Sequence, residues 1–181
     1  MATGNTGDRD LVTALLAGHK VTTILHFAAH TIVPESVSDP LKYYGNNTCA
    51  TRNLLECAVR AGVRNFIFSS TAAVYGIPAN GIASEDTPTA PINSYGSSKL
   101  MSEWMLRDID LAHPMRHVSL RYFNVAGADP GGRLSRARAP ISARPVPSRA
   151  TPTRMAGRRP RRSRFSSAGM IFLNARSPVM P

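Results

Sequence analysis

The chain has 181 residues, 43% of them hydrophobic, which is enough for one globular domain with a buried core. Its net charge of +11 is unevenly spread: residues 1–131 hold 10 Lys and Arg against 11 Asp and Glu, whereas residues 132–181 hold 12 Arg and no Lys or acidic residue. The N-terminus lacks a signal-peptide pattern and no apolar run approaches a membrane span, so we expect a cytoplasmic protein.

The first 131 residues alternate strand-like and helix-like patterns. Compact apolar runs predict strands at 21–29, 63–76 and 117–127. A helix is predicted over 39–62, ending at Gly62, from apolar and small residues at three- and four-residue steps: Leu41, Tyr44, Thr48, Thr51, Leu55 and Ala58. A second helix is predicted from Ser94 to just before Pro114, with these residues toward the core: Leu100, Trp104 and Leu106.

This order of strands and helices predicts an α/β fold with a parallel sheet and helices packed on its faces. In such sheets ligands bind beyond the carboxyl ends of the strands. Three strand ends therefore converge on one place, namely residues 26–29, 69–71 and 122–124. Strands also end in small and polar residues simply to form turns, so one such end would be weak evidence and the three together are stronger.

Tyr95 and Lys99 are four residues apart and so lie on one face of the second helix. A free tyrosine has a pKa of about 10, and a nearby ammonium together with a cationic cofactor could lower it toward neutrality. The two residues are then either a solvated helix start or a proton-transfer pair. A hydroxyl-bearing strand end at Thr71, upstream in the chain, favours the pair.

Four stretches resemble the extended short-chain dehydrogenase/reductase family, in its NAD-dependent epimerase/dehydratase branch. They span roughly residues 4–133: ILHFAAHTIVPESVSDPLKYYGNNTCATRNLLE, NFIFSSTAAVYG, INSYGSSKLMSEWML and LRYFNVAGADPGGR. The resemblance implies a Rossmann-like, doubly wound sheet and tightly bound NAD. It also implies C4 epimerisation of a UDP-sugar, the interconversion of UDP-glucose and UDP-galactose in galactose metabolism, through a transient 4-keto sugar. Intact family members of this type are expected to be homodimers.

The resemblance also assigns roles residue by residue. Tyr95 looks like the base for the 4-hydroxyl proton, Lys99 the residue that lowers its pKa and binds the nicotinamide ribose, and Thr71 their hydroxyl partner. Thr71, Tyr95 and Asn124 are the expected substrate contacts. The expected cofactor contacts are Asn5, Phe27, Ala28, Ala29, Asn46, Ser69, Tyr95, Lys99 and Phe123.

Two short segments refine the expected activity. Related 4,6-dehydratases carry acidic residues after the strand-end threonine, whereas here Ala72 and Ala73 follow it, which favours epimerisation. The family opens with a strand and a glycine-rich phosphate loop. The TGNTG segment at 3–7 instead resembles a later segment near the adenine, with Asn5 in place of the usual acid. We therefore expect residues 1–131 to be a partial NAD-binding domain without its first βαβ unit, impaired or inactive by itself.

Residues 132–181 abandon both the resemblance and any periodicity. Arg, Pro, Ala and Ser dominate, and Lys and the acidic residues are absent. A disordered or frameshifted tail is the main interpretation, and a basic arm or an unrecognised domain are the others. The alternative function is accordingly a non-enzymatic protein that binds nucleic acid through this tail. Cys49 and Cys57 are expected to be buried free thiols, and no metal site is expected.

Overall fold

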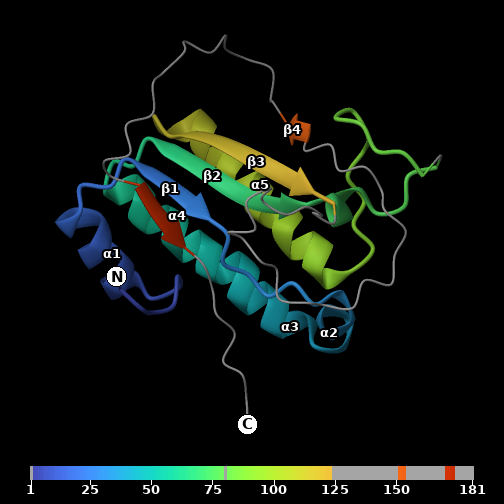
Figure 1. Cartoon of the computed structure of the whole chain (residues 1–181), viewed down its shortest axis with the longest axis horizontal. Coiled ribbons are helices and arrows are strands. Elements are labelled where there is room, and N and C mark those ends of the chain that lie inside the picture. Colours follow the sequence, from blue (N-terminus) through green and yellow to red (C-terminus); the bar gives the residue numbers. More distant parts are fainter. Residues whose placement is uncertain (1, 80, 124–150, 154–169, 174–181) are drawn as a thin grey trace, which may run out of the picture.

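The computed structural model describes residues 2–79, 81–123, 151–153 and 170–173, and strands and helices alternate through most of that range (Figure 1). The elements are α1 (Arg9–Gly18), β1 (Thr23–His26), α2 (Val33–Ser38), α3 (Pro40–Tyr43), the π-helix η1 (Tyr44–Cys49), α4 (Ala50–Arg60), β2 (Asn65–Thr71), the 3₁₀-helix η2 (Ala72–Tyr75), α5 (Ser94–Ala112), β3 (Arg116–Tyr122), β4 (Thr151–Thr153) and β5 (Met170–Leu173).

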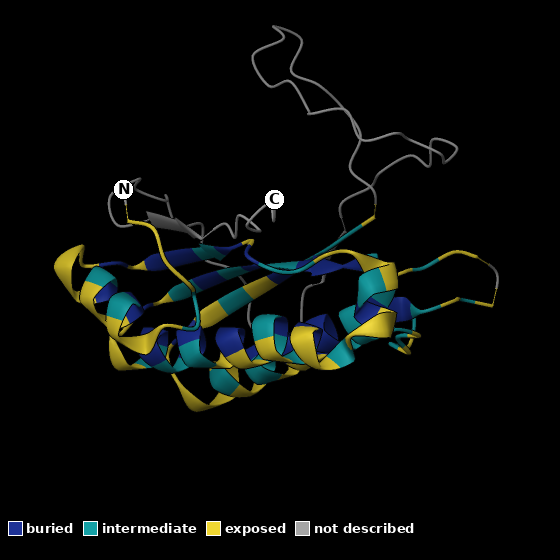
Figure 2. Cartoon of the chain, turned by 90° about the horizontal axis from the view of Figure 1, so that it is seen from below, coloured by how far each residue is buried: buried dark blue, intermediate teal, exposed yellow. Residues whose placement is uncertain are grey.

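The strands form one sheet in the order β4-β3-β2-β1-β5. β1, β2 and β3 run parallel, with Ile24 opposite Phe66 and Thr71 opposite Tyr122. The helices that connect them lie on one side of the sheet (Figure 2), because two crossovers of the same hand that step in the same direction leave their helices on the same face. The predicted α/β fold with a parallel sheet is confirmed.

Two short strands come from the tail. β5 pairs parallel with β1, and β4 pairs antiparallel with β3. β1 and β3 would otherwise be the edges of the parallel sheet, and an edge presents unpaired backbone N–H and C=O groups that a short segment can bind. These two segments of the tail join the sheet, and the rest of residues 124–181 lies outside the described residues, so that a disordered or frameshifted tail stays a prediction.

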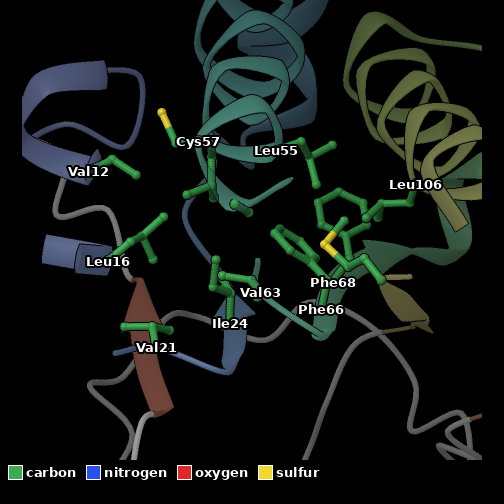
Figure 3. Packing of buried hydrophobic residues seen from close by; sticks show 13 residues of the cluster. Val12, Leu16, Val21, Ile24, Leu55, Cys57, Val63, Phe66, Phe68 and Leu106 are labelled. Atoms are coloured by element: carbon green, nitrogen blue, oxygen red, sulfur yellow. The ribbon is translucent and has the colours of Figure 1, made fainter. Parts of the chain in front are cut away.

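The apolar core lies between the sheet and its helices (Figure 3). Phe66 and Phe68 of β2 are each 1% exposed and pack with Leu106 of α5. α1, which the sequence analysis did not predict, adds Val12 and Leu16 to the same cluster. Asp8 caps this helix by accepting a hydrogen bond from the Leu11 backbone N–H.

Three expectations about individual side chains are wrong. Trp104 is 47% exposed, because α5 presents Lys99 and Glu103 to the sheet and this turns Trp104 away. Leu41 is 78% exposed and Tyr43 is buried in its place. The cause is η1: a π turn holds more residues than an α turn, so the face before it is rotated relative to the face after it. Cys49, at the end of η1, is exposed.

None of the helices in the described residues is both long and apolar enough to cross a membrane.

Candidate active site

The first turn of α5 packs closely against the turn that follows β2. Asn93 caps the helix by accepting a hydrogen bond from the Gly96 backbone N–H at 2.8 Å. A Cβ at Gly96 would lie 2.7 Å from the Ala73 carbonyl oxygen, closer than real Cβ atoms come to backbone. The glycine therefore lets the helix approach η2 and holds Tyr95 beside the end of β2.

Tyr95 is half-buried and lies within hydrogen-bonding reach of Thr71, while the catalytic roles of the two residues stay predictions. Burial raises the pKa of Tyr95 above its usual value, and a side-chain hydrogen bond with Thr71 acts in the opposite direction. Thr71 is itself 8% exposed, and its hydroxyl also accepts the Ala73 backbone N–H at 3.2 Å. Strand end and helix start thus supply two hydroxyl groups to one place.

Lys99 is 3% exposed, and its Nζ donates to the Ser69 carbonyl oxygen at 2.8 Å. The ammonium also lies 4.8 Å from the centroid of the Phe68 ring. Burial lowers the pKa of Lys99 to about 8, although the charge of Glu103 acts to raise it. The predicted influence of Lys99 on Tyr95 stays a prediction, because here the ammonium is bound to a backbone oxygen of β2.

The other predicted cofactor contacts follow the same strand ends. Phe27 is 39% exposed after β1 and Phe123 is 50% exposed after β3, whereas Ala28 is buried. Ala29 and Ser69 are half-buried. Two accessible aromatic faces, small residues and a cation at the carboxyl edge of the sheet fit the nicotinamide and ribose of a dinucleotide.

Two of the predicted contacts lie in other elements, and a third lies outside the described residues. Asn46 is in η1, where its amide donates to Asn47 Oδ1 at 3.0 Å. Asn5 lies in the turn before α1, where its side chain accepts the Gly7 N–H at 2.8 Å. Asn124 lies outside the described residues. Neither Asn5 nor Asn46 makes a direct hydrogen bond to Thr71 or Tyr95 in the described residues.

Asn47 is a site residue that the sequence analysis missed. It is 2% exposed, and its amide joins the loop after β1 to α5. Oδ1 accepts the His30 backbone N–H at 2.8 Å, and Nδ2 donates to the His30 carbonyl at 3.0 Å and to Ser98 Oγ at 3.1 Å. Ser98 Oγ in turn donates to the Tyr95 carbonyl. The only sequence signal was an asparagine pair inside a helical pattern, where asparagine is disfavoured.

Two further titratable residues lie near the site, Tyr43 close to Tyr95 and His26 close to Lys99. Tyr43 is fully buried and meets the Tyr95 ring edge-on, with ring centroids 6.4 Å apart. Burial, followed by the hydrogen bond and charge of Glu35, raises the pKa of Tyr43 to about 12. Burial and then the charge of Lys99 lower the pKa of His26 to about 3. Tyr43 therefore stays protonated and His26 neutral at physiological pH.

The sequence of the chain decides its family. The NAD dependent epimerase/dehydratase family matches residues 1–163. The chain belongs to this family. It is 53% identical over 134 residues to the UDP-glucose 4-epimerase of Azospirillum brasilense, and the match covers 74% of this chain and 38% of that protein. The chain thus spans well under half the length of this curated relative.

Solved structures of the same family share the fold. The UDP-glucose 4-epimerase of Brucella ovis in complex with NAD superposes with a TM-score of 0.73 at 39% identity, over 78% of this chain and 44% of that one. The enzyme of Bifidobacterium longum in complex with NAD+ and UDP gives a TM-score of 0.68 at 41% identity, over 72% of this chain and 40% of that one. The Rossmann-like fold class predicted from the sequence is therefore confirmed.

Proposed function

We propose that this chain provides the catalytic core of an NAD-dependent UDP-sugar 4-epimerase that interconverts UDP-glucose and UDP-galactose. The observation that carries the proposal is the Thr71–Tyr95 pair beside the buried Lys99 at the carboxyl edge of the sheet. It is supported by the 53% identity to a UDP-glucose 4-epimerase over the stretch that contains all three residues. The proposed role is one in galactose metabolism.

Each residue of the pair has a part in moving the C4 proton. Tyr95 takes the proton of the 4-hydroxyl and returns it after the 4-keto sugar has rotated in the site to present its opposite face. Thr71 holds the phenol by its hydrogen bond. Lys99 binds the nicotinamide ribose and favours the phenolate. Bound NAD would supply the hydride acceptor and donor. Phe27, Ala28, Ala29, Ser69 and Phe123 line its nicotinamide end, Asn46 and Asn5 contact it further out, and Asn124 binds the sugar nucleotide.

Epimerisation is favoured over dehydration by η2. Ala72 and Ala73 directly follow the strand-end threonine, and neither side chain can donate or accept a proton. Elimination of water needs an acid and a base at the sugar, whereas epimerisation needs, besides the hydride transfer to and from NAD, only the reversible removal of one hydroxyl proton. A keto sugar formed in this site therefore has no carboxyl group from these two positions to drive the loss of water.

The test is a chimera that places the matched 134 residues of this chain within the Azospirillum brasilense relative. The chimera should convert UDP-galactose to UDP-glucose, measured by a coupled assay with UDP-glucose dehydrogenase. Tyr95→Phe in the same chimera is the matched control and should lower conversion by roughly 10²–10⁴-fold. A chimera that folds and binds NAD but gives no conversion would contradict the proposal.

The proposed function includes a homodimer built on the outer faces of α4 and α5. An open groove of about 430 Å³ runs between these helices, with an apolar floor of Leu55, Val59, Met105 and Ile109. Its rim carries Arg52 on α4 and Asp108 on α5. A second copy related by a two-fold axis would set the arginine of one chain against the aspartate of the other.

Sedimentation velocity tests the dimer. Val59→Arg, inside the groove, should give a monomer, and Leu111→Arg, 84% exposed on α5 but not in the groove lining, should not. A monomeric unsubstituted chain at high concentration would contradict the dimer.

The alternative of a nucleic-acid-binding tail gains no support. Its arginine cluster at 158–164 lies outside the described residues, and the relatives are named as epimerases. The expected cytoplasmic location and the origin of the tail stay predictions.

A further inference from the structure

A buried ion pair lies directly behind the candidate active site. Glu103 of α5 is 7% exposed, and its carboxylate binds Arg121 of β3 in a bidentate arrangement. Arg121 Nη2 donates to Oε2 at 2.6 Å, and Arg121 Nε lies 3.1 Å from Oε1 and 3.2 Å from Oε2. The pair is shielded from water, since the two side chains are 8% and 9% exposed.

The same carboxylate also reaches β2. The Ser70 hydroxyl, 4% exposed, donates to Glu103 Oε1. Ser70 and Arg121 are register partners in neighbouring strands, so their side chains lie next to each other on the face of the sheet that α5 covers. The Arg121 guanidinium is in turn 4.8 Å from the Tyr75 ring centroid. Glu103 therefore joins one helix to two strand ends.

Glu103 is also one helical turn beyond Lys99, which is itself one turn beyond Tyr95. The three residues meet consecutive positions of β2: Tyr95 meets Thr71, Lys99 the Ser69 carbonyl and Glu103 the Ser70 hydroxyl. A shift of α5 along the sheet would break all three contacts together. The mechanism above uses the first two contacts and leaves the third without a role.

We propose that Glu103 is a positioning residue of the site: bound to Arg121 and Ser70, its carboxylate fixes α5 against the ends of β2 and β3 and balances the ammonium charge of Lys99. A buried carboxylate and guanidinium cost free energy to desolvate, and a well-packed apolar pair would fill the same space at least as stably. The ion pair, unlike an apolar pair, places a negative charge one helical turn from the buried ammonium of Lys99 and so stabilises its charged form.

The charge on Lys99 depends on the groups that surround it, and Glu103 is the acidic one among them in the described residues. Burial lowers the pKa of Lys99, and Glu103 is the residue that opposes this effect. Arg121 can only act in the same direction as burial, and His26 is neutral at physiological pH. His26 on β1 and Glu103 on α5 act on Lys99 directly, and the groups that face Glu103 or its partner are Arg121 and His117 on β3 and, against the Arg121 guanidinium, Tyr75 in η2.

Direct titration of Lys99 tests the proposal in the full chain without ligand. The chain has three lysines, Lys20, Lys42 and Lys99, so a protein labelled at the lysine side chains gives three NMR signals, and Lys99→Arg assigns the one that matters. The unsubstituted chain should titrate at about 8. Glu103→Gln keeps the shape and removes the charge, and should lower the pKa of Lys99 by about one unit or more.

The direction of the shift separates this role from a merely structural one. A loosened site would hydrate Lys99 and raise its pKa toward the usual value in any disruptive variant. Glu103→Gln is therefore the variant that decides, because loss of the charge lowers the pKa of Lys99 whereas loosening raises it; Arg121→Gln should raise the pKa on either account. Glu56→Gln removes an arginine-bound glutamate on α4 and should leave Lys99 unchanged.

If Glu103→Gln does not fold, the double variant Glu103→Gln/Arg121→Gln decides, because it removes the carboxylate and the guanidinium together and so leaves neither of them buried without the other. Lys99 should again titrate below its value in the unsubstituted chain. An unchanged or raised pKa of Lys99 in whichever of these two variants folds would overturn the proposal. The proposal rests on the proposed function for the importance of Lys99, but this titration needs neither NAD nor sugar. Failure of the proposed function would instead appear in the turnover of the chimera.

Discussion

The two ends of the parallel sheet differ in what they bury, although the same strand and helix run through both. At the apolar end, Phe66 and Phe68 of β2 pack with Leu106 of α5. At the polar end, the last residues of β2, Ser70 and Thr71 among them, and the preceding turns of α5 bury hydroxyl and charged groups beside a small apolar cluster of Leu100, Val74 and Tyr75. The change occurs within about one turn of helix and two residues of strand.

Stability and chemistry therefore reside at opposite ends of the same elements. A buried large apolar side chain contributes about 1.5–3 kcal/mol of transfer free energy, whereas a buried polar group costs free energy unless it is bonded. The polar end accordingly pairs its groups: Lys99 with Ser69, Ser70 with Glu103, and Thr71 with Tyr95. The apolar end stabilises the fold and thereby holds the polar end in place for function.

The largest expected effect is at the polar end. Tyr95→Phe in the chimera removes one hydroxyl and should lower turnover by roughly 10²–10⁴-fold, because the C4 proton loses its acceptor. The KM for UDP-galactose should change little, and circular dichroism should stay that of the unsubstituted chimera. Near-full turnover in this variant would mean that Tyr95 is not the base and that the Tyr95–Lys99 spacing only marks the start of a helix.

The corresponding change at the apolar end should act on stability alone. Phe66→Ala should lower the free energy of unfolding of the chain by about 3–5 kcal/mol, through lost burial and a residual cavity. Leu111→Ala, on the exposed part of α5, should cost no more than about 0.5 kcal/mol. Urea unfolding followed by circular dichroism measures both. Equal costs for the two substitutions would mean that the cluster around Phe66 is not the core.

Thr71→Ala should be intermediate and specific to the polar end. Turnover of the chimera should fall by about 10²-fold, as when one aligned hydrogen-bonding group is lost. Because the Thr71 hydrogen bond lowers the pKa of Tyr95, its removal should raise that pKa and move the rising limb of the pH–rate profile to higher pH. Thr71→Ser keeps the hydroxyl and should retain the original limb. A profile that does not move in Thr71→Ala would argue against this hydrogen bond.

Lys99 offers the smallest and most selective test, through the pH dependence of stability. Its pKa is about 8 in the folded chain, against 10.5 for a lysine exposed to water. Between these values the unfolded chain binds more protons, so stability rises with pH. Lys99→Met removes this contribution. Unfolding free energies of the two proteins, compared from about pH 7.5 to about pH 10, should diverge by about 2 kcal/mol in favour of lysine. A constant difference would show that Lys99 is not buried as described.

Much of the site was predictable because it follows from local pattern. Tyr95 and Lys99 share a helix face through their spacing, and Thr71 ends a strand of recognisable apolar pattern. The bounds of that strand were predicted as 63–76 and are Asn65–Thr71, since the turn residues of η2 continue the apolar composition. Asn47 and the burial of Tyr43 were not predictable from periodicity, because the π turn of η1 rotates the helix face within one segment.

Local sequence was sufficient for the order of strands and helices, for the family, and for the hydroxyl and amine groups offered at the strand ends. Which of these groups are buried, and what they bind, was settled only by tertiary packing. Glu103 has no pattern that distinguishes it from Glu35 and Glu56, the half-buried glutamates of other helices, yet it meets Arg121 from a distant strand. Its partner, like that of Lys99, is set by the packing of α5 on the sheet, which brings together residues that local sequence keeps apart.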